Sequence, residues 1–206
     1  DVVVGLIAGC EGAFIKAREG SEDSTELAKQ DLIQIGLNER DIVIGLAASG
    51  RTPYVLGGLS YAQEVGCHTA AISNTYHSKI GEVAEIAVDV PVGAEVLTGS
   101  TRLKSGTAEK MILNMISTAT MVGLGKAYQN LMVDVMQTNE KLRNRAENIV
   151  MEATGVERSV ARATIDAAKG SCKVAITMIL ANCSYEDALM RLQQACGHVR
   201  EAIMEK

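Results

Sequence analysis

Two short loops combine small hydroxyl residues, glycines and a cation directly ahead of a helical pattern. One is AASGRTP (residues 47–53) and the other lies within GAEVLTGSTRLKSGTAEK (residues 93–110). A helix start presents unpaired backbone N–H groups and the positive end of the helix dipole, so an anion bound there is stabilised. Glycine lets the backbone approach a phosphate closely, and hydroxyls and cations add hydrogen bonds and charge. The pattern predicts a phosphate-binding site.

Neither loop matches the nucleotide-binding pattern GxxxxGK[ST], which favours a phosphorylated small molecule over ATP. Similar loops also occur as ordinary helix N-caps, and this interpretation stays open for AASGRTP taken alone. Two such loops in one α/β pattern favour the phosphate site. The candidate contact residues are Ser49, Gly50, Arg51 and Thr52 in the first loop and Ser100, Thr101 and Lys104 in the second.

Bulk properties limit the class of protein. The chain has 206 residues, and its hydrophobic content of 47% fits a globular protein with a substantial core. It has no apolar run of the roughly 18 residues needed to cross a bilayer. No basic segment leads into an apolar one at its beginning. We therefore expect a cytoplasmic protein that binds no membrane.

The charged and sulfur-containing residues indicate neither a nucleic-acid surface nor a metal site. The net charge is −5 and the Lys and Arg residues are scattered, whereas nucleic-acid binding needs a basic stripe. The three histidines match no metal-ligand spacing. The cysteines are odd in number and form no CxxC pair, so we interpret all of them as small buried hydrophobes: Cys10, Cys67, Cys172, Cys183 and Cys196.

Short β-branched runs alternate with helical patterns over the first part of the chain. Nearly continuous apolar runs of this kind are typical of strands buried on both faces of a parallel sheet. Pro53 and Gly66 suit the start and the end of a helix between two of these strands, which predicts a βαβ unit. The predicted strands cover residues 1–8, 41–48, 68–73 and 84–91.

The pattern changes toward the end of the chain. Residues 101–138 predict a helix, broken near Gly123 and Gly125, with Met111, Met115, Ile116 and Met121 packed against the sheet. Beyond Lys141 only short amphipathic helices follow. We expect a boundary near residues 140–146, which divides an α/β domain (1–142) from a small all-α bundle (143–206).

Parallel sheets bind ligands outside the carboxyl ends of their strands, which is where AASGRTP is expected. The loop at residues 9–13 leaves the first predicted strand at the same edge, and the acidic stretch REGSEDS (residues 18–24) follows it closely. The sequence therefore predicts carboxylates near the phosphate site.

These segments together resemble the N-acetylmuramic acid 6-phosphate etherases, a family within the sugar isomerase (SIS) superfamily. The resemblance covers the whole chain, and the block TGSTRLKSGTAEK is specific to the family. The matching segments are VVVGLIAG, EGSEDS, DIVIGLAASGRTPYV, EVLTGSTRLKSGTAEK, LNMIST and NLMVDVMQTNEKL. Two departures lie near the expected site, where Cys10 replaces a frequent Gly and ISNTY (residues 72–76) replaces ISCNP-like residues.

The resemblance implies a three-layer, flavodoxin-like SIS domain followed by a ubiquitin-associated-like helical bundle, in a homodimer. It implies a lyase of cell-wall sugar recycling that cleaves the D-lactyl ether of N-acetylmuramic acid 6-phosphate to N-acetylglucosamine 6-phosphate and D-lactate. The implied route is elimination across C2 and C3 of the open-chain sugar followed by addition of water, without a metal or organic cofactor.

Two glutamates share the proton transfers in this family. Matching EGSED to the family's EGAED places one of them at Glu22, which the resemblance makes the base that removes the C2 proton. Glu19 is a near competitor that the sequence does not separate from it. For Lys104 the resemblance leaves open a contact with the lactyl carboxylate in place of the phosphate.

The second family glutamate, which protonates the departing lactate, lies before the region that matches Asp1. The chain therefore resembles the C-terminal two thirds of a family member. We expect that the natural gene product is longer, or that the remaining segment was cleaved or is supplied by another chain. A non-catalytic sugar-phosphate sensor, like the glucokinase regulatory protein, is the alternative, because it would need the loops but no glutamate. A sugar-phosphate isomerase fits the specific segments less well.

Overall fold

A computed structural model describes residues 3–16 and 18–204, and it divides into two compact units, residues 1–113 and 114–206. The first unit contains a parallel sheet of three strands in the order β1-β2-β3, β1 being Ile42–Leu46, β2 His68–Ser73 and β3 Ile86–Asp89. Both strand pairs are parallel. The β1–β2 pairing begins with Ile42 opposite His68, and the β2–β3 pairing begins with Ala70 opposite Ile86. The predicted α/β class with a parallel sheet is confirmed.

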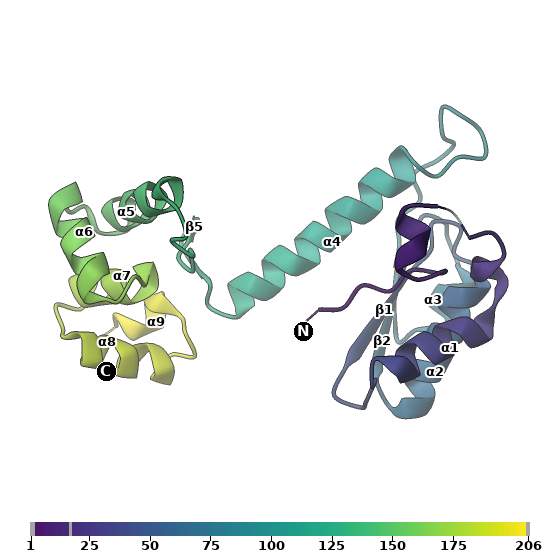
Figure 1. The fold of residues 1–206 in the computed structure, drawn as a ribbon, viewed down its shortest axis with the longest axis horizontal. Helices are drawn as coiled ribbons and strands as arrows, with labels where there is room; N and C mark the ends of the chain where they lie inside the picture. Colours follow the sequence, from purple (N-terminus) through teal and green to yellow (C-terminus); the bar gives the residue numbers. More distant parts are fainter. Residues whose placement is uncertain (1–2, 17, 205–206) are drawn as a thin grey trace. The chain divides into compact units, whose positions relative to one another are not determined.

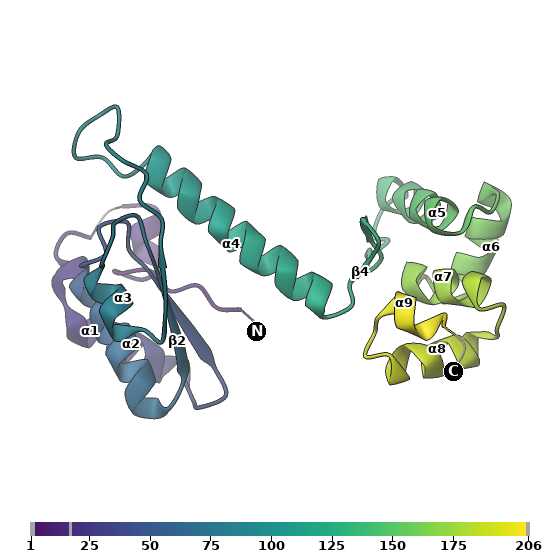
Figure 2. The same ribbon diagram turned by 180° about the vertical axis from the view of Figure 1, so that it is seen from behind.

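Helices cover this sheet (Figures 1 and 2). Helix α2 (Pro53–Val65) contacts β1 and β2, α3 (Lys79–Val83) contacts β2 and β3, and α1 (Thr25–Gln34) packs on α2. Pro53 opens α2 and Gly66 ends it in the left-handed conformation, as predicted. The buried core between sheet and helices includes Ala47, Leu59, Ala71 and Ile80.

The predicted strand over residues 1–8 is wrong where the structure describes it. Residues 3–8 pair with no strand, and Val3 and Val4 are 82% and 52% exposed; residues 1–2 lie outside the described part. A strand needs a neighbouring backbone for its hydrogen bonds, and an apolar run alone does not supply one. Two short 3-10 helices follow, η1 (Glu11–Phe14) and η2 (Ser21–Asp23).

The helix predicted over residues 101–138 is shorter than expected. Helix α4 covers Lys104–Gly123, and a two-stranded antiparallel hairpin follows, made of β4 (Ala127–Tyr128) and β5 (Leu131–Met132). Met111, which lies in the same unit as the sheet, is 48% exposed, so the prediction that it packs against the sheet is wrong. For Met115, Ile116 and Met121, which fall in the second unit, packing against the sheet stays a prediction. The compact units divide within α4, after Leu113.

The end of the chain is a helical bundle. Its helices are α5 (Glu140–Thr154), α6 (Arg158–Ala167), α7 (Cys172–Leu180), α8 (Tyr185–Gln194) and α9 (Val199–Ala202). Val133, Val150, Ile176 and Val199 lie in one continuous core with the hairpin. The predicted all-α character is confirmed, while the division at 142/143 stays a prediction.

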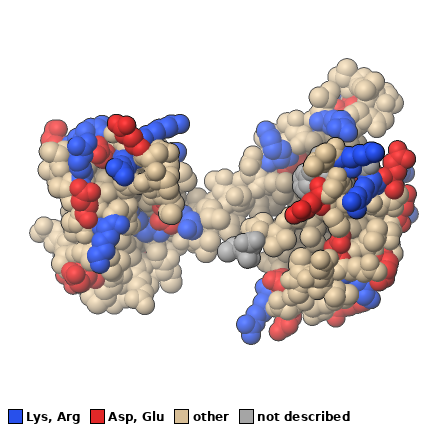
Figure 3. Space-filling view, in the orientation of Figure 1, with Lys and Arg blue, Asp and Glu red and all other residues tan. Residues whose placement is uncertain are grey.

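Surface properties agree with part of the predictions. Cys67 and Cys172 are buried as expected, but Cys10 and Cys196 are exposed and Cys183 is half-buried, so the burial prediction is wrong for these three. Figure 3 shows lysines and arginines interspersed with aspartates and glutamates on each unit. No helix in the described part of the chain is both long and apolar enough to cross a membrane.

The second unit contains a buried carboxylate with two cationic partners. The Glu147 side chain is 8% exposed, with Oε2 2.7 Å from Arg158 Nη1 and Oε1 2.7 Å from Arg162 Nε. The bonds from Arg162 and Arg158 hold the pKa of Glu147 below its usual value. Because the pKa of Glu147 is lower in the folded state, its two ion pairs stabilise the fold above the unfolded pKa of about 4.3. This stabilisation is lost as the pH falls through the lower, folded-state pKa.

Replacement of Glu147 with Gln is therefore expected to lower the melting temperature at pH 7, with a difference that shrinks below about pH 4. Calorimetric unfolding at several pH values measures this. The matched control is Glu152→Gln, on the exposed side of the same helix, which should leave the melting temperature within about 1 °C. An effect of Glu147→Gln that is independent of pH would contradict the charge argument.

Candidate functional site

The loop between β1 and α2 presents the groups that the phosphate prediction requires. Thr52 is the N-cap residue of α2, yet its side chain makes no capping hydrogen bond, so the hydroxyl is not used by the helix. Ser49 and Arg51 are exposed and Thr52 is half-buried. Because α2 is 13 residues long, its first amides carry the positive end of a full helix dipole. This geometry does not support the ordinary N-cap interpretation of AASGRTP.

Gly50 gives this loop its tight shape. Its φ is +67°, and its N–H donates to the Ala47 carbonyl over 2.8 Å. A Cβ at this position would lie 2.4 Å from Ser78 Cβ and 2.9 Å from Thr75 Cγ2. Only glycine combines the left-handed backbone with this contact.

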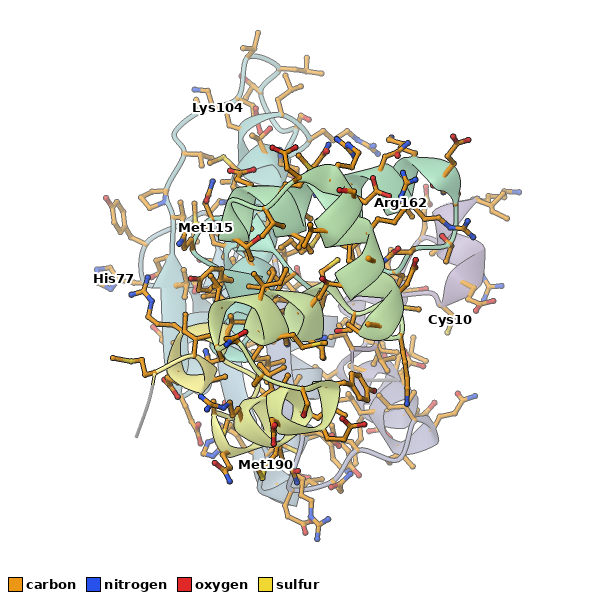
Figure 4. The ribbon with its side chains drawn as sticks, turned by 90° about the vertical axis from the view of Figure 1, so that its left-hand side faces the viewer. Cys10, His77, Lys104, Met115, Arg162 and Met190 are labelled. Atoms are coloured by element: carbon orange, nitrogen blue, oxygen red, sulfur yellow. The ribbon has the colours of Figure 1, made fainter. Side chains whose placement is uncertain are left out.

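The second predicted loop has a different arrangement at the start of α4. The Glu95 carboxylate accepts hydrogen bonds from the backbone N–H groups of Lys104 (3.0 Å) and Ser105 (3.2 Å), which lowers the pKa of Glu95. The Lys104 ammonium donates to the Ala94 carbonyl over 2.9 Å (Figure 4). The first amides of α4, which we expected to face a ligand phosphate, thus bind an internal carboxylate.

Ser100 and Thr101 lie in the turn before α4. Ser100 Oγ accepts a hydrogen bond from the Arg102 N–H over 3.2 Å, and Thr101 is exposed. The residue that sequence reasoning missed here is Glu95. No local signal in the sequence points to Glu95, because an N-cap is expected directly before the first turn and Glu95 lies nine residues ahead of α4.

The two loops leave the same edge of the sheet. The first follows β1 and the second follows β3, and β2 lies between them. Two strand spacings separate β1 from β3 by about 10 Å. Among residues 3–16 and 18–204, no hydrogen bond joins the two loops directly.

Glu22 lies on η2, a segment that packs against α2. Two features hold this region onto α2. The backbone of Thr25 lies so close to Gly57 that a Cβ on Gly57 would meet the Thr25 carbonyl oxygen at 2.1 Å. The Tyr54 hydroxyl donates to Asp31 Oδ2 over 2.6 Å, and burial together with this bond raises the pKa of Tyr54.

Glu22 and the first loop therefore belong to one packed assembly, because α2 starts at that loop and contacts η2. Glu22 and Glu19 are both exposed, so burial does not separate the two candidates for the base. Of the predicted residues, Glu22 lies on a segment that contacts α2, and residues 49–52 directly precede α2. Residues 100–104 follow a different strand of the same sheet.

The parallel α/β sheet with a glycine-serine-threonine loop ahead of α2 is consistent with a SIS domain, and the family model of the glucokinase regulatory protein N-terminal SIS domain matches residues 2–63. The chain is 56% identical over 201 residues to the N-acetylmuramic acid 6-phosphate etherase of Oceanobacillus iheyensis, covering 98% of this chain and 68% of that protein. The etherase of Bacillus anthracis is 56% identical over 202 residues, covering 98% of this chain and 69% of that protein. This chain belongs to the N-acetylmuramic acid 6-phosphate etherase family.

The Gly50 geometry yields a test that uses inorganic phosphate as the probe. Gly50→Ala should destabilise the first unit by about 2 kcal/mol or more, because the new side chain strains the left-handed backbone and clashes with Ser78 and Thr75. The loop backbone must then shift, which should weaken phosphate binding. Gly36→Ala is the matched control, since Gly36 has φ +76° but no atom within 4 Å of its added Cβ. It should cost about 1 kcal/mol and leave phosphate binding unchanged. Urea unfolding and calorimetric titration measure both; equal effects of the two variants would refute the packing argument.

Proposed function

We propose that this chain carries the activity for which its relatives are named, cleavage of the D-lactyl ether of N-acetylmuramic acid 6-phosphate. The products are N-acetylglucosamine 6-phosphate and D-lactate. The observation that carries the proposal is the packing of the Glu22 segment onto α2, the helix whose first turn follows the Ser49–Thr52 loop. A phosphate at the start of α2 and a base beside that helix are the two groups that the reaction needs first.

Binding would begin with the 6-phosphate in the first loop. The backbone amides at the start of α2, the hydroxyls of Ser49 and Thr52 and the guanidinium of Arg51 are the donors. Ser100, Thr101 and Lys104 would contact the ligand from the loop that follows β3. The Lys104 ammonium, now bonded to the Ala94 carbonyl, would exchange that bond for the phosphate or for the lactyl carboxylate.

Glu22 is the proposed base. In the open-chain sugar the C1 aldehyde acidifies the C2 proton, and the carboxylate removes it as the C3–O bond to lactate breaks. Water then adds at C3 and the proton returns to C2, so no net oxidation occurs. The departing lactate oxygen also takes up a proton, and we assign that donor to no residue of this chain.

The base assignment is tested by deuterium incorporation at C2 of N-acetylglucosamine 6-phosphate in D2O, followed by NMR. Glu22→Gln should lower the exchange rate by about 100-fold or more and leave the ligand dissociation constant within about twofold. Glu19→Gln is the matched control and should exchange at nearly the rate of the unmodified chain. The reverse ranking would move the base to Glu19, and ligand binding without any exchange in the unmodified chain would favour a non-catalytic sensor.

The sensor is the weaker candidate. The match to the glucokinase regulatory protein model covers residues 2–63, whereas the etherase relatives match along 98% of the chain. The cytoplasmic location and the lack of nucleic-acid binding stay predictions.

A homodimer is part of the proposal. The surface that supports it is the part of α4 in the second unit, where the exposed apolar side chains include Met115 and Ile116. Met115→Glu is expected to shift a dimer toward monomer by at least tenfold in dissociation constant, measured by sedimentation equilibrium. Sedimentation of the unmodified chain as a monomer at micromolar concentration would contradict the dimer.

A further inference from the structure

Asp89, at the end of β3, accepts hydrogen bonds from three donors. Its Oδ1 lies 2.8 Å from Ser73 Oγ and 3.0 Å from Ser78 Oγ, and its Oδ2 accepts from the His77 N–H over 2.9 Å. The bond from Ser73, followed by those from Ser78 and His77, holds the pKa of Asp89 below its usual value. One charged group therefore organises the loop of residues 74–78 that follows β2.

This loop is held in an unusual conformation. His77 has a φ of +51°, in the left-handed region that non-glycine residues rarely adopt, and its side chain projects outward from the loop (Figure 4). Such a residue persists only where neighbouring contacts require it, and the bond from its N–H to Asp89 is one of these contacts. Ser78 Oγ also accepts from the Gly81 N–H over 3.1 Å, so the same hydroxyl caps α3.

The loop 74–78 and the residues after it are hydrogen-bonded to residues 47–53, the first predicted phosphate loop. The Asn74 N–H donates to the Ala48 carbonyl and the Ile80 N–H donates to the Gly50 carbonyl, each over 3.0 Å. Ser78 also lies where a side chain on Gly50 would be. Asp89 is thus linked to Gly50 through Ser78 and through Ile80, two residues further along the chain, whose N–H donates to the Gly50 carbonyl.

We propose that Asp89 is a positioning residue for the phosphate loop: by fixing Ser73, His77 and Ser78, it sets Gly50 and hence the amides at the start of α2. Asp89 itself does not contact the ligand in this proposal. The inference rests on the proposed function, because it assumes that residues 49–52 bind the phosphate. It adds Asp89, which lies on β3, two strands away from β1, and outside both predicted loops.

A second aspartate offers a matched control. Asp41 precedes β1 at the opposite, amino edge of the sheet, and its Oδ2 accepts from Asn38 N and Asn38 Nδ2, each over 2.9 Å. Asp41 therefore fixes a turn in the same way but far along the strand from the phosphate loop. If Asp89 matters only for folding, Asp89→Ala and Asp41→Ala should affect ligand binding alike.

The experiment compares these two variants in binding of N-acetylglucosamine 6-phosphate and in C2 exchange at saturating ligand. We expect Asp89→Ala to raise the dissociation constant about tenfold while the exchange rate at saturation stays within about twofold. Asp89→Asn, which keeps one acceptor oxygen, should restore part of the affinity. Asp41→Ala should leave the dissociation constant unchanged. Equal dissociation constants for Asp89→Ala and the unmodified chain would overturn the proposal.

A double-mutant cycle and a ligand-free measurement complete the test. Ser78→Ala removes one of the three donors to Asp89 together with the α3 cap. Its effect on the dissociation constant should be partly non-additive with that of Asp89→Ala, because the Ser78–Asp89 bond is lost in both variants. Amide hydrogen exchange at Asn74 and Ile80 should accelerate in Asp89→Ala and not in Asp41→Ala. Unchanged amide exchange would also overturn the proposal. If the unmodified chain binds no phosphosugar, the proposed function fails, while amide exchange still decides whether Asp89 fixes the loop.

Discussion

The parallel pairing of three short strands determines the rest of the first unit. Because β1, β2 and β3 run in the same direction and in register, their carboxyl ends meet at one edge of the sheet. Each loop that leaves this edge lies beside the next, so chemistry can be assembled from residues far apart in the sequence. The bonds from Asn74 to Ala48 and from Val90 to the Ser73 carbonyl are products of this adjacency. An antiparallel sheet would send alternate loops to opposite edges.

Local chemistry explains which elements could be predicted. The runs that became β1, β2 and β3 are rich in apolar and β-branched residues, and α2 carries Pro at its start and Gly just after its end, so these elements follow from nearby residues. Residues 3–8 have the same apolar character but no partner strand, and pairing is a property of two segments. The exposed methionines of α4 are a second example. Periodicity predicts that they share an apolar face of the helix, but it does not predict which element covers that face.

The site was predictable to a similar degree. Residue type and position ahead of a helix indicated Ser49 to Thr52, and the structure leaves the Thr52 hydroxyl unused by its own helix. Asp89 was not selected, although a lone carboxylate at the end of an apolar strand is an informative departure from its surroundings. Its partners Ser73, His77 and Ser78 converge on it only through the fold. The departure at residues 72–76 noted in the sequence lies directly beside this network.

The Glu95 carboxylate at the start of α4 has a consequence for the order of binding. A phosphate that approaches these amides competes with an anion already attached to the same chain, nine and ten residues away from its two donors. A tethered competitor of this kind acts at an effective concentration on the order of millimolar, so free phosphate at lower concentration does not displace it. A ligand already held at the start of α2 would itself be tethered, so it would compete with Glu95 on more equal terms than free phosphate does.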